Sequence, residues 1–111
     1  MRFIHTDNFP SLEQLQYYFE VDKKSGEIKQ IRDFRLGTTF HIAQDVNIET
    51  DLSGEKLISI VDSEGNERKY SAAKIIFALA FNKEVSDKQK VYYKNNDSRT
   101  IHPSNVVIRS W

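Results

Sequence analysis

Apolar residues recur at helical spacing in two segments of the chain. In residues 11–20, Leu12, Leu15 and then Tyr18 or Phe19 follow one another at intervals of three or four residues, as apolar residues do on one face of an α-helix. Ser11 precedes them and is one of the residue types that cap helix N-termini through a side-chain oxygen. This segment is therefore predicted to form a short helix.

The second helical segment, residues 71–81, is the more regular of the two. Ser71 is its candidate N-cap. One face of the predicted helix carries Ile75, Ile76, Leu79 and Ala80. Three further alanines in the segment allow close packing, so we expect this helix to lie in the core.

Between the two helices, short apolar runs alternate with turn-forming Asp, Ser, Asn and Gly residues. A hairpin is predicted over residues 19–31, because apolar residues flank the turn formers at 22–26. Further strands are predicted at 46–50, 57–61 and 67–70, with turns at 51–54 and 62–66. Residues 32–44 are ambiguous, with a bend at Gly37 and the start of a strand near Phe40. The middle of the chain is therefore predicted to be a small antiparallel sheet.

The C-terminal third predicts one more hairpin. Residues 91–94 and 100–102 are strand-like and flank the polar turn at 95–98. Pro103 suits the first position of a short helical turn, because it lacks an N–H to satisfy. A charged linker, residues 82–90, connects the second helix to this hairpin.

Length and composition favour one folded domain, residues 1–111. Hydrophobic residues make up 39% of the chain and aromatic residues 12%, which is enough to build a modest core. The predicted fold class is α+β, a small antiparallel sheet of hairpins with two helices. We divide it into an N-terminal helix with hairpins at 10–70 and a C-terminal part at 71–111.

Several classes of protein are excluded by what the sequence lacks. The chain has no cysteine, so disulfides, thiolate zinc sites and thiol nucleophiles are impossible. Its N-terminus lacks the apolar core of a signal peptide, and no run approaches the roughly 18 apolar residues of a membrane span. We therefore expect a cytoplasmic protein with no membrane partner.

Charge is unevenly distributed although the formal net charge is zero. Residues 1–66 hold seven Lys and Arg against twelve Asp and Glu, whereas residues 67–111 hold nine against four. The C-terminal part is therefore suited to face phosphates, and the N-terminal part is not. The alternative is an uneven partition of solvated charge without a function.

The order of these elements resembles that of the His-Asn-His (HNH) endonucleases found among small phage proteins. The resemblance extends over residues 12–109, from an opening hairpin at 19–28 and the helix after Lys69 to the C-terminal hairpin. It implies a ββα-metal motif in the C-terminal part of the chain, residues 71–111.

The catalytic positions are where this resemblance fails. The family carries a histidine base, with an Asp or Asn before it, at the end of the first motif strand, and those places are Tyr93 and Tyr92 here. A phenol has an ordinary pKa of about 10 and is a poor base at neutral pH. A neutral tyrosine is also a poor ligand for a hard cation such as Mg²⁺. The resemblance thus implies a degenerate site, with no bound metal and no cofactor.

Two other polar residues of the motif region, Asn105 and His102, have predicted roles. Asn105 matches the middle asparagine of the family, which braces the loop and orients the base, and that bracing role persists without catalysis. His102 is an outside candidate for a substitute base, although a His-Pro pair at a strand end is more often structural. The family's last metal ligand falls beyond Trp111. His5 and His41 are isolated from any carboxylate pattern.

Basic residues in and around the motif make up the candidate nucleic-acid-binding set. They are Lys69, Lys74, Lys88, Lys90, Lys94, Arg99 and Arg109. Interleaved with Tyr92, Tyr93 and Trp111, they suit phosphate contacts and base stacking. The plainer alternatives are lysines that solvate a face and tyrosines that are half-buried in a strand.

Three functions remain open at this level. The first is a non-enzymatic, HNH-like protein that binds DNA. The second is a small phage-type regulatory protein, monomeric or a homodimer, that binds and inhibits or adapts a host or phage protein. The third is a metal-dependent endonuclease with a rearranged site built from Asp97 and His102. We favour the first, because the base and metal positions are replaced while the basic residues are kept.

Overall fold

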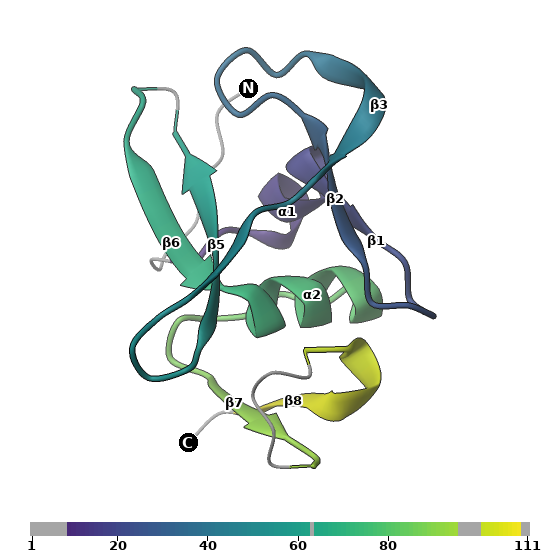
Figure 1. Ribbon diagram of the computed structural model, residues 1–111, viewed down its shortest axis with the longest axis vertical. Helices are drawn as coiled ribbons and strands as arrows, with labels where there is room; N and C mark the ends of the chain where they lie inside the picture. The colour runs from purple at the N-terminus through teal and green to yellow at the C-terminus, as the bar shows by residue number, and fades with distance from the viewer. Residues whose placement is uncertain (1–8, 63, 96–100, 110–111) are drawn as a thin grey trace.

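The computed structural model describes residues 9–62, 64–95 and 101–109. Its helices are α1 (Leu12–Tyr18), α2 (Ala72–Phe81) and the short 3₁₀ turn η1 (Pro103–Asn105). Its strands are β1 (Phe19–Val21), β2 (Ile28–Arg32), β3 (Thr39–Asp45), β4 (Ile48–Thr50), β5 (Lys56–Val61), β6 (Glu67–Ser71), β7 (Lys90–Tyr93) and β8 (Val106–Arg109). Figure 1 shows their arrangement.

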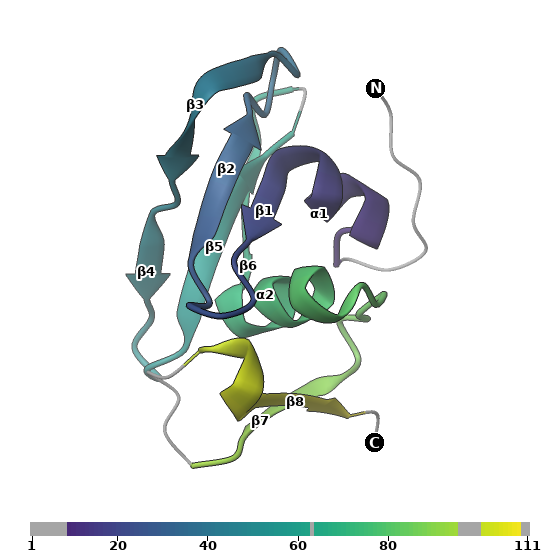
Figure 2. The ribbon, with the colours of Figure 1, turned by 90° about the vertical axis from the view of Figure 1, so that its right-hand side faces the viewer.

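The strands form two three-stranded antiparallel meanders and one two-stranded ribbon. The meanders have the strand orders β1-β2-β3 and β4-β5-β6, and β7 pairs with β8. Both helices lie on one side of the meanders, and the ribbon lies beneath α2 (Figure 2). The predicted α+β class, with two helices and small antiparallel sheets, is confirmed.

The four turns inside the meanders share one construction. In each, an aspartate accepts backbone N–H groups through Oδ1, as Asp22 does from Lys24 at 2.8 Å, and a glycine follows three or four residues later with positive φ. The pairs are Asp22 with Gly26, Asp33 with Gly37, Asp51 with Gly54, and Asp62 with Gly65. These are all four glycines of the chain. Each therefore occupies a left-handed conformation that a side chain would strain.

Both predicted helices are present, and both begin at the predicted serine caps. Ser11 Oγ accepts the N–H of Gln14 at 3.1 Å, and Ser71 Oγ accepts that of Lys74 at 3.3 Å. The carboxylate of Glu84 also accepts the N–H of Leu12, with oxygens at 3.0 and 3.1 Å. The linker after α2 therefore helps to hold the start of α1.

The core lies where α2 packs between the meanders and the ribbon. Its largest fully buried side chains include Leu15, Phe19, Ile58, Ile75 and Ile76. The expected apolar face of α2 is largely correct, since Ile75, Ile76 and Ala80 are buried and Leu79 is half-buried. This single helix thereby contacts β1, β5, β6, η1 and β8.

The second arm of the C-terminal hairpin differs from the prediction. β7 pairs with Val106–Arg109 and not with residues 100–102; of these, residues 101 and 102 form no strand and residue 100 lies outside the described part. His102 instead caps η1, whose predicted first residue, Pro103, is correct. The run of β-branched residues after Asn105 supplies the strand, because it places apolar side chains against α2.

Candidate functional site on the C-terminal ribbon

The C-terminal ribbon, defined here as β7 and β8, has two different faces. Residues directly opposite each other in an antiparallel pair share a face, and faces alternate along each strand. The inner face consists of Val91, Tyr93, Val106 and Ile108, and the outer face of Lys90, Tyr92, Val107 and Arg109. Val106 is buried, whereas Lys90, Tyr92 and Arg109 are exposed. One face therefore holds the ribbon on the protein and the other meets solvent.

The outer face combines an aromatic ring with cations. Lys90 lies directly opposite Arg109 in the register, and the Arg109 guanidinium carbon lies 5.8 Å from the centre of the Tyr92 ring. Lys88 and Lys94 are exposed just before and just after β7. Residues 88–95 and 101–109 contain no Asp or Glu. The solvent side of the ribbon is therefore positively charged around an exposed phenol ring.

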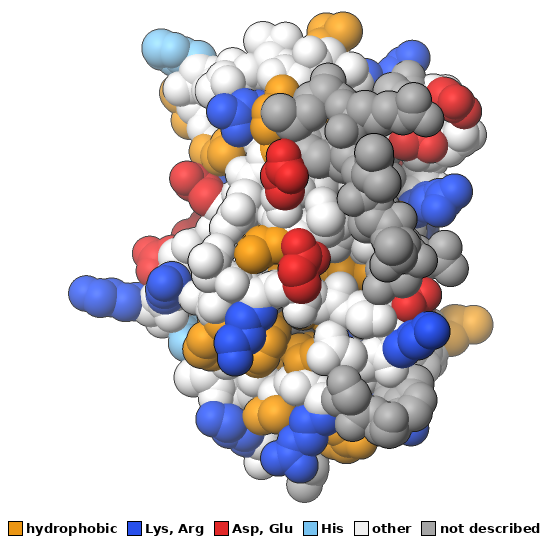
Figure 3. All heavy atoms as spheres, turned by 180° about the vertical axis from the view of Figure 1, so that it is seen from behind, with side chains coloured by type: hydrophobic (Ala, Val, Ile, Leu, Met, Phe, Trp, Pro, Cys, Tyr) orange, Lys and Arg blue, Asp and Glu red, His pale blue; other side chains and the backbone are white. Residues whose placement is uncertain are grey.

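The space-filling view shows how charge is distributed on one face of the molecule. Lys and Arg side chains surround apolar ones at the lower end, where β7 and β8 lie, and the carboxylates of this face lie above them (Figure 3). The unequal charge of the two parts of the sequence thus becomes, on this face, an unequal charge of two ends of the molecule.

Tyr93, which the HNH resemblance predicts to occupy the position of the base, points the other way from Tyr92. Its hydroxyl lies 3.5 Å from Glu55 Oε2, and Ser71 Oγ donates to the other oxygen of the same carboxylate at 2.9 Å. Burial, together with the charge and hydrogen bond of Glu55, raises the pKa of Tyr93 to about 12. The phenol consequently stays protonated at neutral pH and cannot accept a proton from water.

Asn105 joins the two strands of the ribbon at the end where β7 finishes and β8 begins. It is 8% exposed, and its side chain both accepts the N–H of Asn95 at 3.1 Å and donates to Asn95 Oδ1 at 2.9 Å. Its carbonyl oxygen accepts the N–H of Lys94 at 2.9 Å. These bonds continue the pairing of the strands beyond Tyr93 and Val106, so Asn105 braces this end of the ribbon.

His102 uses both of its ring nitrogens within the fold. Nδ1 accepts the backbone N–H of Ser104 at 3.1 Å, and Nε2 lies 2.6 Å from the carbonyl oxygen of Lys24. Since Nδ1 is an acceptor, this hydrogen-bond geometry assigns the proton to Nε2, which donates to Lys24. His102 thus links the first hairpin turn to η1.

Gly26 is the partner of His102 that sequence reasoning missed. A β-carbon at Gly26 would lie 3.0 Å from His102 Cδ2 and 3.0 Å from Pro103 Cδ. The close approach of two backbone segments explains the glycine, in addition to its φ of 75°. No local signal connects two residues so far apart in the chain.

The remaining cations of the predicted set lie elsewhere or outside the described residues. Lys69 is on β6, where its ammonium lies 2.6 Å from Glu49 Oε2. Lys74 is on α2 and donates to the backbone carbonyls of Ser86 and Asp87 at 3.2 and 3.3 Å. Arg99 falls in a part of the chain that is not described, as do Asp97, Trp111 and His5, whereas His41 is exposed on β3. The structure therefore places Lys88, Lys90, Lys94 and Arg109 on or beside the ribbon, whereas Lys69 lies on β6 and Lys74 on α2.

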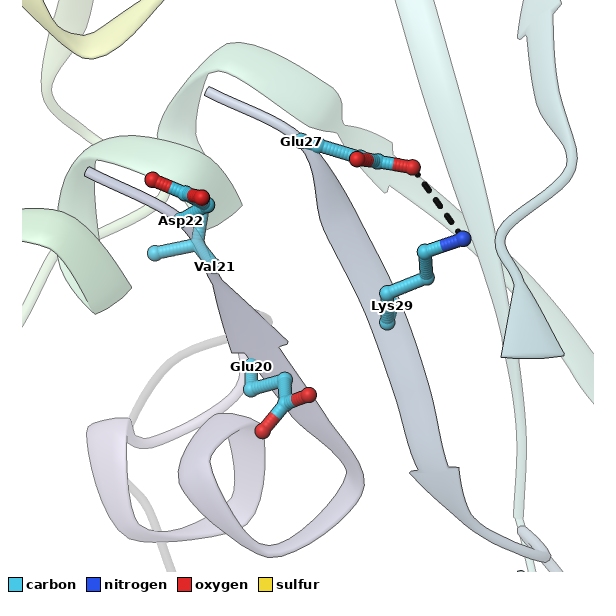
Figure 4. Close-up of a pocket in the computed structure, with 5 residues that line it drawn as sticks. All are labelled: Glu20, Val21, Asp22, Glu27 and Lys29. Carbon is cyan, nitrogen blue, oxygen red and sulfur yellow. Dashed lines mark ion pairs between the residues drawn. The ribbon is translucent and has the colours of Figure 1, made fainter. Parts of the chain in front are cut away.

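An acidic hollow of about 340 Å³ lies beside the first hairpin. Glu20, Asp22 and Glu27 line it, with Lys29 paired to Glu27 at 3.1 Å (Figure 4). Lys29 also pairs with Asp45, and Asp22 serves as the acceptor of its own turn. Within the described ranges, no three His, Cys, Asp or Glu residues are placed to hold a metal ion. Glu27 and Asp22 therefore have partners within the hairpin, namely Lys29 and the backbone of the turn.

No family model, curated protein or solved structure matches this chain. Among the described residues, no helix has the length and apolar character needed to cross a membrane.

Proposed function

We propose that the protein binds nucleic acid through the outer face of the C-terminal ribbon and does not cleave it, as a catalytically degenerate HNH-like domain. The observation that carries this proposal is the cross-strand pair of Lys90 and Arg109 beside the exposed ring of Tyr92. Two neighbouring cations can contact the phosphates of a nucleic acid, and an exposed aromatic ring can contact its bases.

The surroundings of the pair support an anionic partner. Lys88 and Lys94 extend the positive charge beyond both ends of β7, and neither strand contains a carboxylate. Binding of this kind is driven by the release of counterions from the phosphates, so its affinity falls steeply as salt rises. The meanders hold most of the acidic residues and would remain away from the nucleic acid.

Two observations support binding without cleavage. Tyr93 holds its proton at neutral pH because its pKa is raised to about 12. His102 uses both ring nitrogens in bonds to Ser104 and to the Lys24 carbonyl. A general base needs a free lone pair within reach of the attacking water. Neither side chain offers one in this arrangement.

The test compares two double variants that remove the same charge from different places. Lys90→Gln with Arg109→Gln neutralises the outer face of the ribbon, and Lys23→Gln with Arg35→Gln neutralises one exposed lysine and one exposed arginine outside it. Fluorescence anisotropy with labelled DNA is recorded across a salt series, with Mg²⁺ and Mn²⁺ added in a parallel gel assay. Each lost phosphate contact should lower the salt slope by about 0.7–0.9.

The ribbon variant should bind weakly with a reduced salt slope, and the control variant should bind as the wild type does. Equal binding by both variants would remove the basis for this interface. Intact DNA in the gel supports a non-enzymatic role, whereas metal-dependent cleavage contradicts it. In that case His102→Ala would show whether His102 takes part.

A protein partner is the second candidate function, and it draws on a different surface. Leu36 and Ile42 are 81% and 76% exposed, in the turn after β2 and on β3. β3 pairs irregularly with β2 between Gln30 and Arg32. Exposed apolar residues beside an edge strand suit contact with a protein, including a second copy of this chain. Light scattering of the wild type and of Leu36→Lys with Ile42→Lys tests that case.

A further inference from the structure

We infer that the outer face of the ribbon prefers single-stranded nucleic acid, because an unpaired base stacks on Tyr92 while Lys90 and Arg109 contact the flanking phosphates. This inference rests on the proposed function and names its ligand class. It depends on the position of one ring within the charged face, and not on the charge itself.

The composition of the face matches a nucleotide better than a duplex surface. At its centre Tyr92 lies opposite Val107, and the cations Lys90 and Arg109 lie opposite each other at one end. A duplex presents phosphates and groove edges outward and keeps its base faces stacked inside. Against such a surface, Tyr92 and Val107 would be desolvated without gaining an apolar contact. An unpaired base offers a π-face to Tyr92 and a phosphate to each cation.

The exposure and setting of the Tyr92 ring support stacking. The residue is 49% exposed, and side chains of a strand stand roughly perpendicular to the sheet. The Arg109 guanidinium at 5.8 Å from the ring centre adds a cation to the stack. Because the neighbouring Tyr93 points inward to Glu55, the two tyrosines divide the roles of ligand contact and anchoring.

Phe81 provides a matched control for the aromatic ring. It is 47% exposed at the end of α2, nearly as exposed as Tyr92, and its ring packs against Phe77 with centroids 4.8 Å apart. It lies outside the ribbon. If aromatic exposure alone attracted nucleic acid, Phe81 and Tyr92 would contribute equally.

The experiment uses three probes in the same buffer: an oligothymidylate, an abasic strand with the same number of phosphates, and the oligothymidylate annealed to oligoadenylate. The wild type should bind the oligothymidylate about tenfold more tightly than the abasic strand, and also more tightly than the duplex. Tyr92→Leu should lose about tenfold on the oligothymidylate and nothing on the abasic strand. Tyr92→Trp should keep the affinity, and Phe81→Leu should match the wild type.

The outcomes separate this inference from the proposed function. If the Lys90→Gln, Arg109→Gln variant binds every probe as the wild type does, nucleic-acid binding by the ribbon is itself wrong. If that variant weakens every complex but Tyr92→Leu changes none, binding stands and stacking is overturned. Tighter binding of the duplex than of the oligothymidylate also overturns it. Circular dichroism of each variant verifies the fold, which the exposed position of Tyr92 should preserve.

Discussion

The two meanders and the C-terminal ribbon share antiparallel pairing but differ in the charge of their side chains. In the meanders, residues 19–71, eleven Asp and Glu accompany eight Lys and Arg, and four of those acids close turns through their own carboxylates. The strands of the ribbon contain no Asp or Glu. Where β7 ends and β8 begins, they are joined by hydrogen bonds between Asn105 and Asn95. The same backbone geometry therefore presents a surface of mixed charge or a cationic one, depending on which side chains point to solvent.

The two regions are joined by α2, and the largest expected effect comes from breaking its packing. Ile75→Ala removes a fully buried side chain and should cost about 2–5 kcal/mol of the free energy of unfolding. Leu52→Ala, at a fully exposed position, should change it by less than about 0.5 kcal/mol. Urea denaturation measures both. Hydrogen exchange should show that meander and ribbon amides lose protection together in Ile75→Ala, and protection kept in the ribbon alone would contradict a shared core.

A pair of glycine variants sharpens the contact between the first hairpin and the ribbon. Gly26→Ala and Gly65→Ala both place a side chain at positive φ, which should cost about 1–2 kcal/mol each. At Gly26 the added β-carbon also meets His102 and Pro103 at 3.0 Å, whereas at Gly65 the nearest atom is 3.9 Å away. Gly26→Ala should therefore lose at least about 1 kcal/mol more. Equal losses of stability in thermal denaturation would mean that His102 and Pro103 move aside without a cost in free energy.

The brace inside the ribbon is tested by Asn105→Ala, which leaves the backbone and side chain of Asn95 without these bonds. The expected loss of stability is about 1–3 kcal/mol. Asn47→Ala, at an exposed asparagine, is the control. The double variant with Asn95→Ala should lose less than the sum of the single variants, because both single variants remove the bond from Asn105 Nδ2 to Asn95 Oδ1. Simple additivity would show that the two side chains do not act together.

The smallest effect at neutral pH is expected from Tyr93→Phe, and it grows with alkalinity. The folded pKa of Tyr93 is raised from 10.0 to about 12, so the folded protein holds this proton more tightly than the unfolded chain does. The associated stability is fully present below pH 10 and is lost as the pH rises toward about 12. Denaturation midpoints across this range should fall less steeply for Tyr93→Phe than for the wild type. Tyr92→Phe, on the outer face, should follow the wild type, and identical slopes for all three proteins would contradict the raised pKa of Tyr93.

Sequence patterns predicted the helices well because their signals are local. Ser11 and Ser71 cap N–H groups three residues away, and the apolar spacing of each helix is complete within its own segment. The turns were also predictable from the sequence, since each Asp and its Gly lie within five residues of one another. The second arm of the ribbon was misplaced at residues 100–102, although the β-branched residues at 106–108 have the stronger strand propensity. Packing against α2 decided between them.

The candidate site was only partly predictable for the same reason. Sequence reasoning grouped seven basic residues by nearness along the chain, but Lys69 pairs with Glu49 and Lys74 holds the linker. It also treated Tyr92 and Tyr93 alike. Alternation in a strand sends adjacent side chains to opposite faces, and which face is buried depends on the element packed below.

The amino-acid sequence by itself determined the caps, the helical spacing, the Asp and Gly turns and the excess of positive charge near the C-terminus. Each of these rests on interactions within a few residues or on composition. Only the tertiary structure decided that Tyr93 meets Glu55, 38 residues away, and that His102 meets the Lys24 carbonyl, 78 residues away. Such partners are chosen by the packing of α2 against three sheets, which no local pattern encodes. The outer face of the ribbon is what that packing leaves exposed.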